Sequence, residues 1–241
     1  METRRGEGRS VEQEEAQATA AAVQPPTGPD ARQAVAGASA REPLVQRVRG
    51  MAWDRAAGFA VNALLRASIA GFLADVLRRP DDPRYAGKAI PLRNLIIVGS
   101  LSLAFPLLYL RGRRRFGWRG YPVWPDNLYL SLFWLDMAGN FFDLYDRYYN
   151  FDLIPHFHGT GALAGTLYEA FNLPAPATIA ATNVIHGLLE AQEYATDVFF
   201  GTRNVRGVWD SVGDLSVGVL GSLVYVGAVE ARRAIIRAVR G

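Results

Sequence analysis

Six mainly apolar runs limit what this chain can fold into. A helix needs about 20 mainly apolar residues to cross a bilayer, because the hydrocarbon core is about 30 Å thick and a helix rises about 1.5 Å per residue. Several runs reach or approach that length within 241 residues. We therefore predict an all-α fold, a polytopic membrane helix bundle with about six transmembrane helices. The runs are residues 56–77, 95–110, 128–142, 154–173, 177–199 and 212–229.

The residues before the first run differ in composition. Residues 1–49 are rich in Ala, Gln, Glu, Gly and Pro and contain no aromatic residue. Such a segment buries too little apolar surface to offset the entropy that is lost on ordering. We expect residues 1–49 to form a disordered hydrophilic tail and residues 50–241 to form the transmembrane helix bundle.

The positive charge of the chain lies beside the apolar runs. The formal net charge is +3. Basic residues in such places are typical of membrane topology and of contact with lipid headgroups. We therefore expect a multi-pass protein of the cell (inner or plasma) membrane whose partners are membrane lipids, and no nucleic acid. The arginines concerned include Arg111, Arg113, Arg114, Arg115, Arg232, Arg233 and Arg237.

Acidic residues and histidines gather inside the apolar part of the chain. Residues 126–214 contain all three histidines and 11 of the 23 carboxylates, but only Arg147, Arg203 and Arg206 as basic residues. A carboxylate in an apolar interior costs several kcal/mol unless it is protonated, hydrogen-bonded or bound to a cation. This imbalance predicts a bound metal ion, a proton path or a water-filled cavity. The acids are Asp126, Asp136, Asp143, Asp146, Asp152, Glu169, Glu190, Glu193, Asp197, Asp210 and Asp214.

The run 177–199 carries the clearest polar pattern. Its polar residues follow one another at spacings of three or four, which places them on one stripe of a helix. A helix with this spacing can give two or three nitrogen or oxygen ligands to a metal ion inside a bundle. The residues of the stripe are Asn183, His186, Glu190, Glu193 and Asp197.

Two other segments repeat this helical spacing. Asp136, Asn140 and Asp143 are four and three residues apart, and Asp210 is four residues before Asp214. Each set therefore lies on one face of its helix.

Two further histidines lie near the start of the run 154–173. Asp152 and His156 are four residues apart, whereas His158 lies two residues beyond His156 and faces away from it in a regular helix. We expect His156 rather than His158 to reach a shared site.

Each of these residues also has a purely structural interpretation. Asp152 and Asp210 stand just before apolar runs and can act as helix N-caps. Asp143 and Asp146 can face water, and His158 can be an interfacial hydrogen-bonding residue. His186, Glu190 and Glu193 can form a self-satisfied polar network between helices.

Three segments resemble a known family. The chain reads DMAGNFFDLYDRYYNFDLIPHF at residues 136–157, LEAQE at 189–193 and DSVGDLSVGVLG at 210–221. These segments resemble the YjdF-like bacterial inner-membrane proteins, with a looser likeness to the VanZ-like proteins. The resemblance implies a polytopic topology and a shared polar core but no activity. That core would be Asp136, Asp152, His156, Glu190, Glu193, Asp210 and Asp214.

The leading functional hypothesis is a metal-dependent membrane enzyme, hydrolase-like, that acts on a lipid or another hydrophobic substrate. We expect His156, His186, Glu190 and Glu193 to hold a divalent ion, with Asp136 or Asp214 completing the shell. The predicted catalytic residues are Asp136, Glu193 and Asp214, because a carboxylate left off the ion can act as general base. Since the chain has no cysteine, nitrogen and oxygen ligands would suit Zn, Mn, Fe or Mg.

Two other functional classes remain open. In a proton- or cation-coupled transporter the same acids would be strung along a path across the membrane. The chain can also be a scaffold for another membrane protein. Convergence of the ligands on one point would favour the enzyme.

Overall fold

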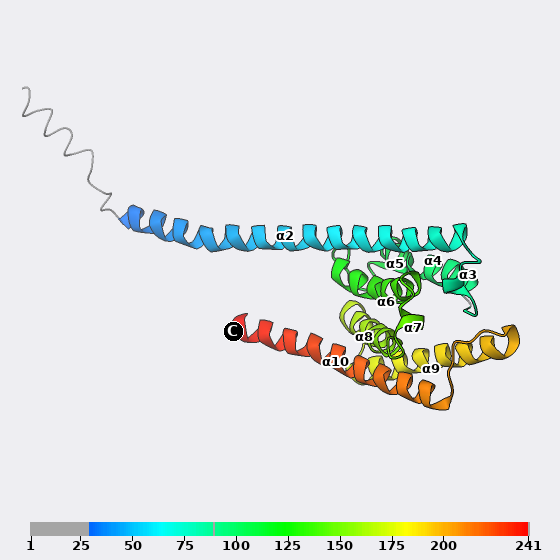
Figure 1. The fold of residues 1–241 in the computed structure, drawn as a ribbon. Helices are drawn as coiled ribbons and strands as arrows, with labels where there is room; N and C mark the ends of the chain where they lie inside the picture. Colours follow the sequence, from blue (N-terminus) through cyan, green and yellow to red (C-terminus); the bar gives the residue numbers. More distant parts are fainter. Residues whose placement is uncertain (1–28, 89, 241) are drawn as a thin grey trace, which may run out of the picture. The chain divides into compact units, whose positions relative to one another are not determined.

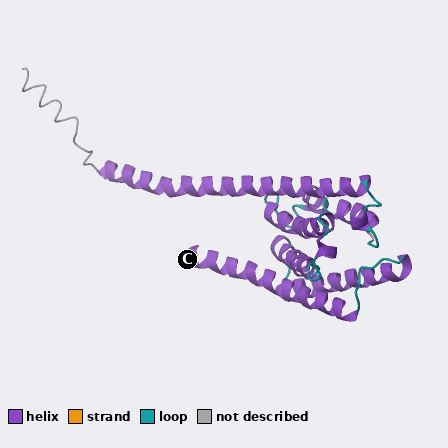
Figure 2. Ribbon diagram, viewed as in Figure 1, coloured by secondary structure: helices purple, strands orange, loops and turns teal. Residues whose placement is uncertain are grey.

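A computed structural model describes residues 29–88 and 90–240 of the chain. Helices joined by turns and loops make up these residues, and no strand occurs among them (Figure 2). The chain divides into two compact units, Met1–Asp54 and Arg55–Gly241. The predicted all-α class is thus confirmed for the described residues.

The first long helix begins earlier than the sequence predicts. Helix α2 covers Pro29–Arg78, so residues 29–49 of the segment expected to be disordered are helical. That expectation rested on the lack of apolar surface, but alanine, arginine, glutamine and glutamate are strong helix formers. Residues 1–28 of the predicted tail lie outside the described residues.

The second unit holds the end of α2 and all later elements (Figure 1). Helix α8 contacts α6, α9 and α10, so three neighbours surround the segment that carries His156. The later elements are the 3₁₀ helix η1 Pro83–Tyr85, α3 Ile90–Arg93, the π-helix η2 Asn94–Val98, α4 Gly99–Leu101, α5 Ala104–Gly112, α6 Val123–Phe141, α7 Leu144–Arg147, α8 Leu153–Ala170, α9 Ala175–Phe200 and α10 Val208–Arg240.

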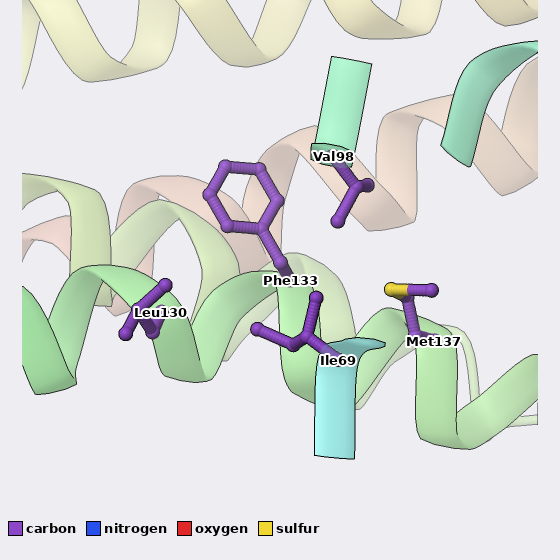
Figure 3. Packing of buried hydrophobic residues seen from close by; sticks show 5 residues of the cluster. All are labelled: Ile69, Val98, Leu130, Phe133 and Met137. Carbon is purple, nitrogen blue, oxygen red and sulfur yellow. The ribbon is translucent and has the colours of Figure 1, made fainter. Parts of the chain in front are cut away.

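A hydrophobic cluster joins α2, η2 and α6. Leu130, Phe133 and Met137 follow one face of α6 at spacings of three and four, as an amphipathic helix requires. Ile69 of α2 and Val98 of η2 complete the cluster, and Figure 3 shows the five side chains gathered between the helices. This packing places α6 next to the second half of α2.

The predicted run 95–110 is not one continuous helix. It consists of η2, α4 and α5, with an interruption at Ser102 and Leu103. Pro106 has no N–H to donate to the carbonyl four residues earlier, which belongs to Ser102. Arg66 of α2 uses that free carbonyl instead, since its Nη1 donates to Ser102 O at 2.6 Å. The interruption therefore helps to place Arg66.

Glycines let α8 and α10 approach each other closely. A methyl group at Gly221 of α10 would come within 2.1 Å of the carbonyl oxygen of Phe157, and one at Gly161 of α8 would come within 2.5 Å of the ring of Tyr225. Small residues at helix contacts allow such backbone proximity, in membranes especially.

Two helices have the length and apolar composition to cross a membrane. They are Ala52–Arg78 and Val208–Val239, and a shorter apolar helical segment covers Ile96–Gly112. The prediction of a membrane protein is supported to this extent, whereas the count of six spans stays a prediction.

The contact at Gly221 gives a prediction about stability. Gly221→Ala should lower the free energy of unfolding by about 1–3 kcal/mol, because the new methyl group meets the backbone of α8. Gly227→Ala is the matched control, since nothing lies within 4 Å of its added methyl group. The control should be neutral or stabilising by about 0.5–1 kcal/mol, because alanine favours a helix over glycine. Unfolding of the detergent-solubilised protein measures both, and equal stability of the two variants would contradict the packing described.

Candidate functional site

Five of the 11 acids in residues 126–214 have a basic partner outside that range among the described residues. Asp126 of α6, 0% exposed, lies 2.7 Å from Arg66 Nη2 of α2 and also accepts hydrogen bonds from Asn62 and Tyr121. Lys88 contacts Asp146, and Arg232 contacts Glu169. These pairs need no bound ion.

A second set of acids surrounds Arg93 of α3. Arg93 Nη1 lies 3.0 Å from Glu193 Oε1, and Arg93 Nη2 lies 3.3 Å from both carboxylate oxygens of Asp136. Tyr145 donates to Asp136 Oδ1 at 2.9 Å. We call Arg93, Asp136, Glu193 and Tyr145 the Arg93 cluster. Asp136 and Glu193, both predicted site residues, are thus held by a cation of the protein itself.

Asp197 and Asp210 are satisfied by backbone amides. Asp197 Oδ1 and Oδ2 accept hydrogen bonds from the amides of Asn204 and Val205 at 2.8 Å. Asp210 Oδ2 accepts one from the Arg206 amide at 2.9 Å. Both acids fix the loop that joins α9 and α10.

Three residues from two helices form a first candidate metal site. His156 Nδ1 of α8 lies 2.8 Å from His186 Nε2 and 3.4 Å from Glu190 Oε1 of α9. Glu190 Oε1 lies 3.6 Å from His186 Nε2, and both residues are buried. Glu190 Oε1 accepts no hydrogen bond from the described residues. His156, His186 and Glu190, the first ligand group, therefore offer two nitrogens and one oxygen to a common point.

The other nitrogen of His156 faces a second group. His156 Nε2 lies 3.3 Å from Asp152 Oδ1 and 3.8 Å from Asp214 Oδ2 of α10. Asp152 occupies the N-cap position of α8 without a capping hydrogen bond from its side chain. Its carboxylate instead belongs to a second candidate metal site. We call Asp152, His156 and Asp214 the second ligand group.

Glycine at position 218 makes room for His186. A methyl group there would come within 2.2 Å of His186 Nδ1 and 3.0 Å of Thr160 Oγ1. His186 Nδ1 has no hydrogen-bond partner among the described residues. The ring is thus held by packing between α8 and α10 and by its contact with His156.

His158 lies away from both ligand groups. Its Nδ1 is 2.7 Å from Tyr225 Oη and its Nε2 is 2.9 Å from Ser131 Oγ. Both ring nitrogens are therefore engaged in a contact between α6, α8 and α10.

A cavity of about 590 Å³ lies beside the ligand groups. Asp152, His156 and His186 line it together with the acids of the Arg93 cluster, and apolar side chains form other parts of the wall. Ligand sites commonly combine apolar walls with a few polar groups in this way. The apolar residues include Ile97, Leu132, Phe133, Leu163, Ile185 and Leu189.

Titratable residues outside the long helices keep one protonation state near neutral pH. Lys88 Nζ donates to Asp146 Oδ2 at 2.7 Å, and this bond lowers the pKa of Asp146. Arg84 donates to Asp82 from its side chain and its backbone, which lowers the pKa of Asp82 to about 2. Burial raises the pKa of Tyr85 to about 12. These residues do not change charge near neutral pH.

The sequence predicted part of this site. Of the predicted site residues, the structure brings His156, His186 and Glu190 together and places Asp214 close to His156. Glu193 belongs to neither ligand group of the described residues, because Arg93 binds it. Arg93 and Arg66 lie outside the range 126–214 and so were missed as partners. Asn62 and Arg66 are four residues apart in an apolar run and so share one face of a helix. That pattern could have indicated a polar contact with a buried acid such as Asp126.

Comparison with known proteins gives no match: no family model, curated protein or solved structure matches this chain. The resemblance to the YjdF-like proteins stays a prediction.

The ion pair of Asp126 gives a prediction that concerns stability alone. Arg66→Met should lower the free energy of unfolding by about 3–5 kcal/mol, because it leaves a buried carboxylate without its cation. Arg79→Met is the control, since Arg79 is exposed and lies 3.6 Å from Asp75; its loss should cost about 0–1 kcal/mol. Denaturant titration of the solubilised protein measures both. Adding Asp126→Asn to Arg66→Met should restore part of the loss, and equal costs for Arg66 and Arg79 would refute this assignment.

Proposed function

We propose that this chain is a multi-pass membrane protein that binds a divalent ion through His156, His186 and Glu190 and hydrolyses a lipid or another hydrophobic substrate. The observation that carries the proposal is the convergence of the first ligand group. Its donor atoms lie within 4.8 Å of one another. Two imidazoles and one carboxylate, with a further position open to water, are typical of catalytic zinc sites.

The distances support the presence of a cation. Two ligands that are each about 2.0–2.1 Å from a tetrahedral ion lie roughly 3.3 Å apart. The two contacts of Glu190 with the histidine nitrogens, 3.4 and 3.6 Å, are close to that separation. The two histidine nitrogens lie closer, at 2.8 Å, where one ring donates a proton to the other. An ion would displace that proton and move the rings apart slightly.

The surface of the helices supports contact with lipid. Large apolar side chains are exposed along α9 and α10, as expected for helices that face hydrocarbon rather than water. We infer that α9, α6 and α8 cross the membrane together with the two helices that have the necessary length and composition. The exposed residues include Val184, Leu188, Val198, Phe199, Val212, Leu215, Val219, Leu220 and Leu223.

The ion would lower the pKa of a bound water and so supply a nucleophile near neutral pH. Asp214, 3% exposed and 3.8 Å from His156 Nε2, would lie on the far side of that ring and so orient its Nδ1 toward the ion. Asp136 and Glu193 would have an indirect role, because their ion pairs hold Arg93 in place. Arg93 and His156 both line the cavity. There Arg93 can contact a polar headgroup while the apolar wall holds the chain of the substrate.

The transporter hypothesis is less well supported. It expects acids that are spread along a path, whereas the first ligand group converges and Asp126 and Glu193 are paired with arginines.

Metal content tests the proposal. The purified wild-type protein, loaded with Zn²⁺ or Mn²⁺ and freed of excess ion, should hold at least one equivalent per chain. His186→Ala should weaken binding more than about tenfold, because it removes a first ligand. His158→Ala is the matched control and should bind as the wild type does, since His158 contacts Ser131 and Tyr225 instead. Elemental analysis and titration against a coloured chelator measure this.

Turnover is tested separately. A panel of membrane lipids incubated with the loaded protein should show hydrolysis that stops on chelation and returns with the ion. Absence of bound metal in the wild type, or equal metal in His186→Ala and His158→Ala, would refute the metal site. Metal binding without turnover would refute the enzyme alone.

A further inference from the structure

We infer that this site holds two divalent ions bridged by the imidazole of His156, one in each ligand group. The inference rests on the proposed function, because it takes the first ligand group as an occupied metal site. It adds a second ion bound by Asp152, His156 Nε2 and Asp214.

Both ring nitrogens of His156 face ligand atoms. Nδ1 is directed at His186 Nε2 and Glu190 Oε1, at 2.8 and 3.4 Å. Nε2 is directed at Asp152 Oδ1 and Asp214 Oδ2, at 3.3 and 3.8 Å. Each nitrogen thus completes a group of three residues whose ligand atoms lie within 4.8 Å of one another.

The simpler arrangement has one ion on Nδ1 and a proton on Nε2. A histidine that binds a metal usually donates its other N–H to a carboxylate. Here Nε2 faces two carboxylates, and both distances exceed the usual range of about 2.7–3.2 Å for an N–H···O bond. One proton cannot serve both acids. By contrast, the 3.3 Å contact with Asp152 equals the roughly 3.3 Å that separates two ligands of a tetrahedral ion, and Asp214 would move about 0.5 Å closer on binding.

Burial of Asp214 argues for the second ion independently. Asp214 is 3% exposed, and its Oδ2 faces His156 Nε2 at 3.8 Å, too far for a hydrogen bond. The contact of Arg206 in this region is with Asp152, at 3.9 Å, and not with Asp214. A buried carboxylate without a donor or a cation is costly. A divalent ion between Asp214, Asp152 and His156 removes that cost.

The second ion requires His156 to lose a ring proton. Both ring nitrogens then bind a metal ion, so the ring is an imidazolate, and its proton passes to water when the second ion binds. The two ions would then lie further apart than the about 3.5–4 Å of sites bridged by single atoms, because a whole ring separates them.

The stoichiometry of the full-length protein tests this inference. Protein stripped with a chelator, reloaded with Zn²⁺ and separately with Mn²⁺, and freed of excess ion should hold two equivalents per chain by elemental analysis. Asp214→Asn should reduce this to one equivalent, because it removes a ligand of the second group alone. Asp210→Asn is the matched control: it makes the same change one turn earlier in α10, at an acid that accepts a bond from the Arg206 amide, and should keep two equivalents.

A bridging ring has a second signature. In protein loaded with two Cu²⁺ ions, the two unpaired electrons should couple through the imidazolate, and the electron paramagnetic resonance signal should change to that of single ions in Asp214→Asn. This measurement decides the question even if the variant binds less tightly.

The outcomes separate the two proposals. Two equivalents in the wild type with one in Asp214→Asn support the bridged pair. One equivalent in the wild type, unchanged by Asp214→Asn, overturns the second ion and leaves the proposed metal enzyme intact. No bound metal in the wild type overturns both. The wild-type stoichiometry decides the outcome even if Asp214→Asn fails to fold.

Discussion

The need to neutralise buried carboxylates determines how the helices of this chain fit together. In a membrane, apolar contacts between helices differ little from contacts with lipid, so polar contacts have a large share in fixing which helices meet. Arg66 ties α2 to Asp126 of α6, and Arg93 ties α3 to Asp136 of α6 and Glu193 of α9. Each ion pair joins segments distant in the sequence. The arrangement of the second unit therefore follows from which cation reaches which acid.

Close packing of α8 against α10 then positions the ligand residues, which form no ion pair with Arg66 or Arg93. Glycines 161 and 221 allow α8 and α10 to approach until side chains of one helix meet the backbone of the other. Gly218 provides the space that the His186 ring fills. The result brings α8, α9 and α10 within ligand distance of one another at His156. A larger residue at any of these glycines would separate the helices that supply the ligands, so packing and ligand geometry depend on each other here.

Local patterns predicted the helices and several residues of the site, whereas the partners of the acids could not be predicted. The spacing of His186 and Glu190 places these two residues on one face of α9. His158 is two residues beyond His156 and therefore points to another face of α8. Arg93 was not identified as the partner of Glu193, because residues 100 positions apart meet only through tertiary packing. The run 95–110 looked continuous because hydropathy does not register the missing N–H of Pro106.

The contrast between the two acidic clusters indicates where exchangeable ions can bind. Asp136 and Glu193 have a permanent cation in Arg93, so their charge is balanced whatever the cavity contains. Glu190 and Asp214 are at least as well buried, yet no arginine or lysine among the described residues forms an ion pair with either. Their contacts are with histidines, which offer nitrogen ligands as well as charge. A fold that provides arginines for Asp126, Asp136 and Glu193 and histidines for Glu190 and Asp214 favours the second pair as the place where an ion from solution binds. That ion would face the cavity of about 590 Å³ through His156 and His186, which line it.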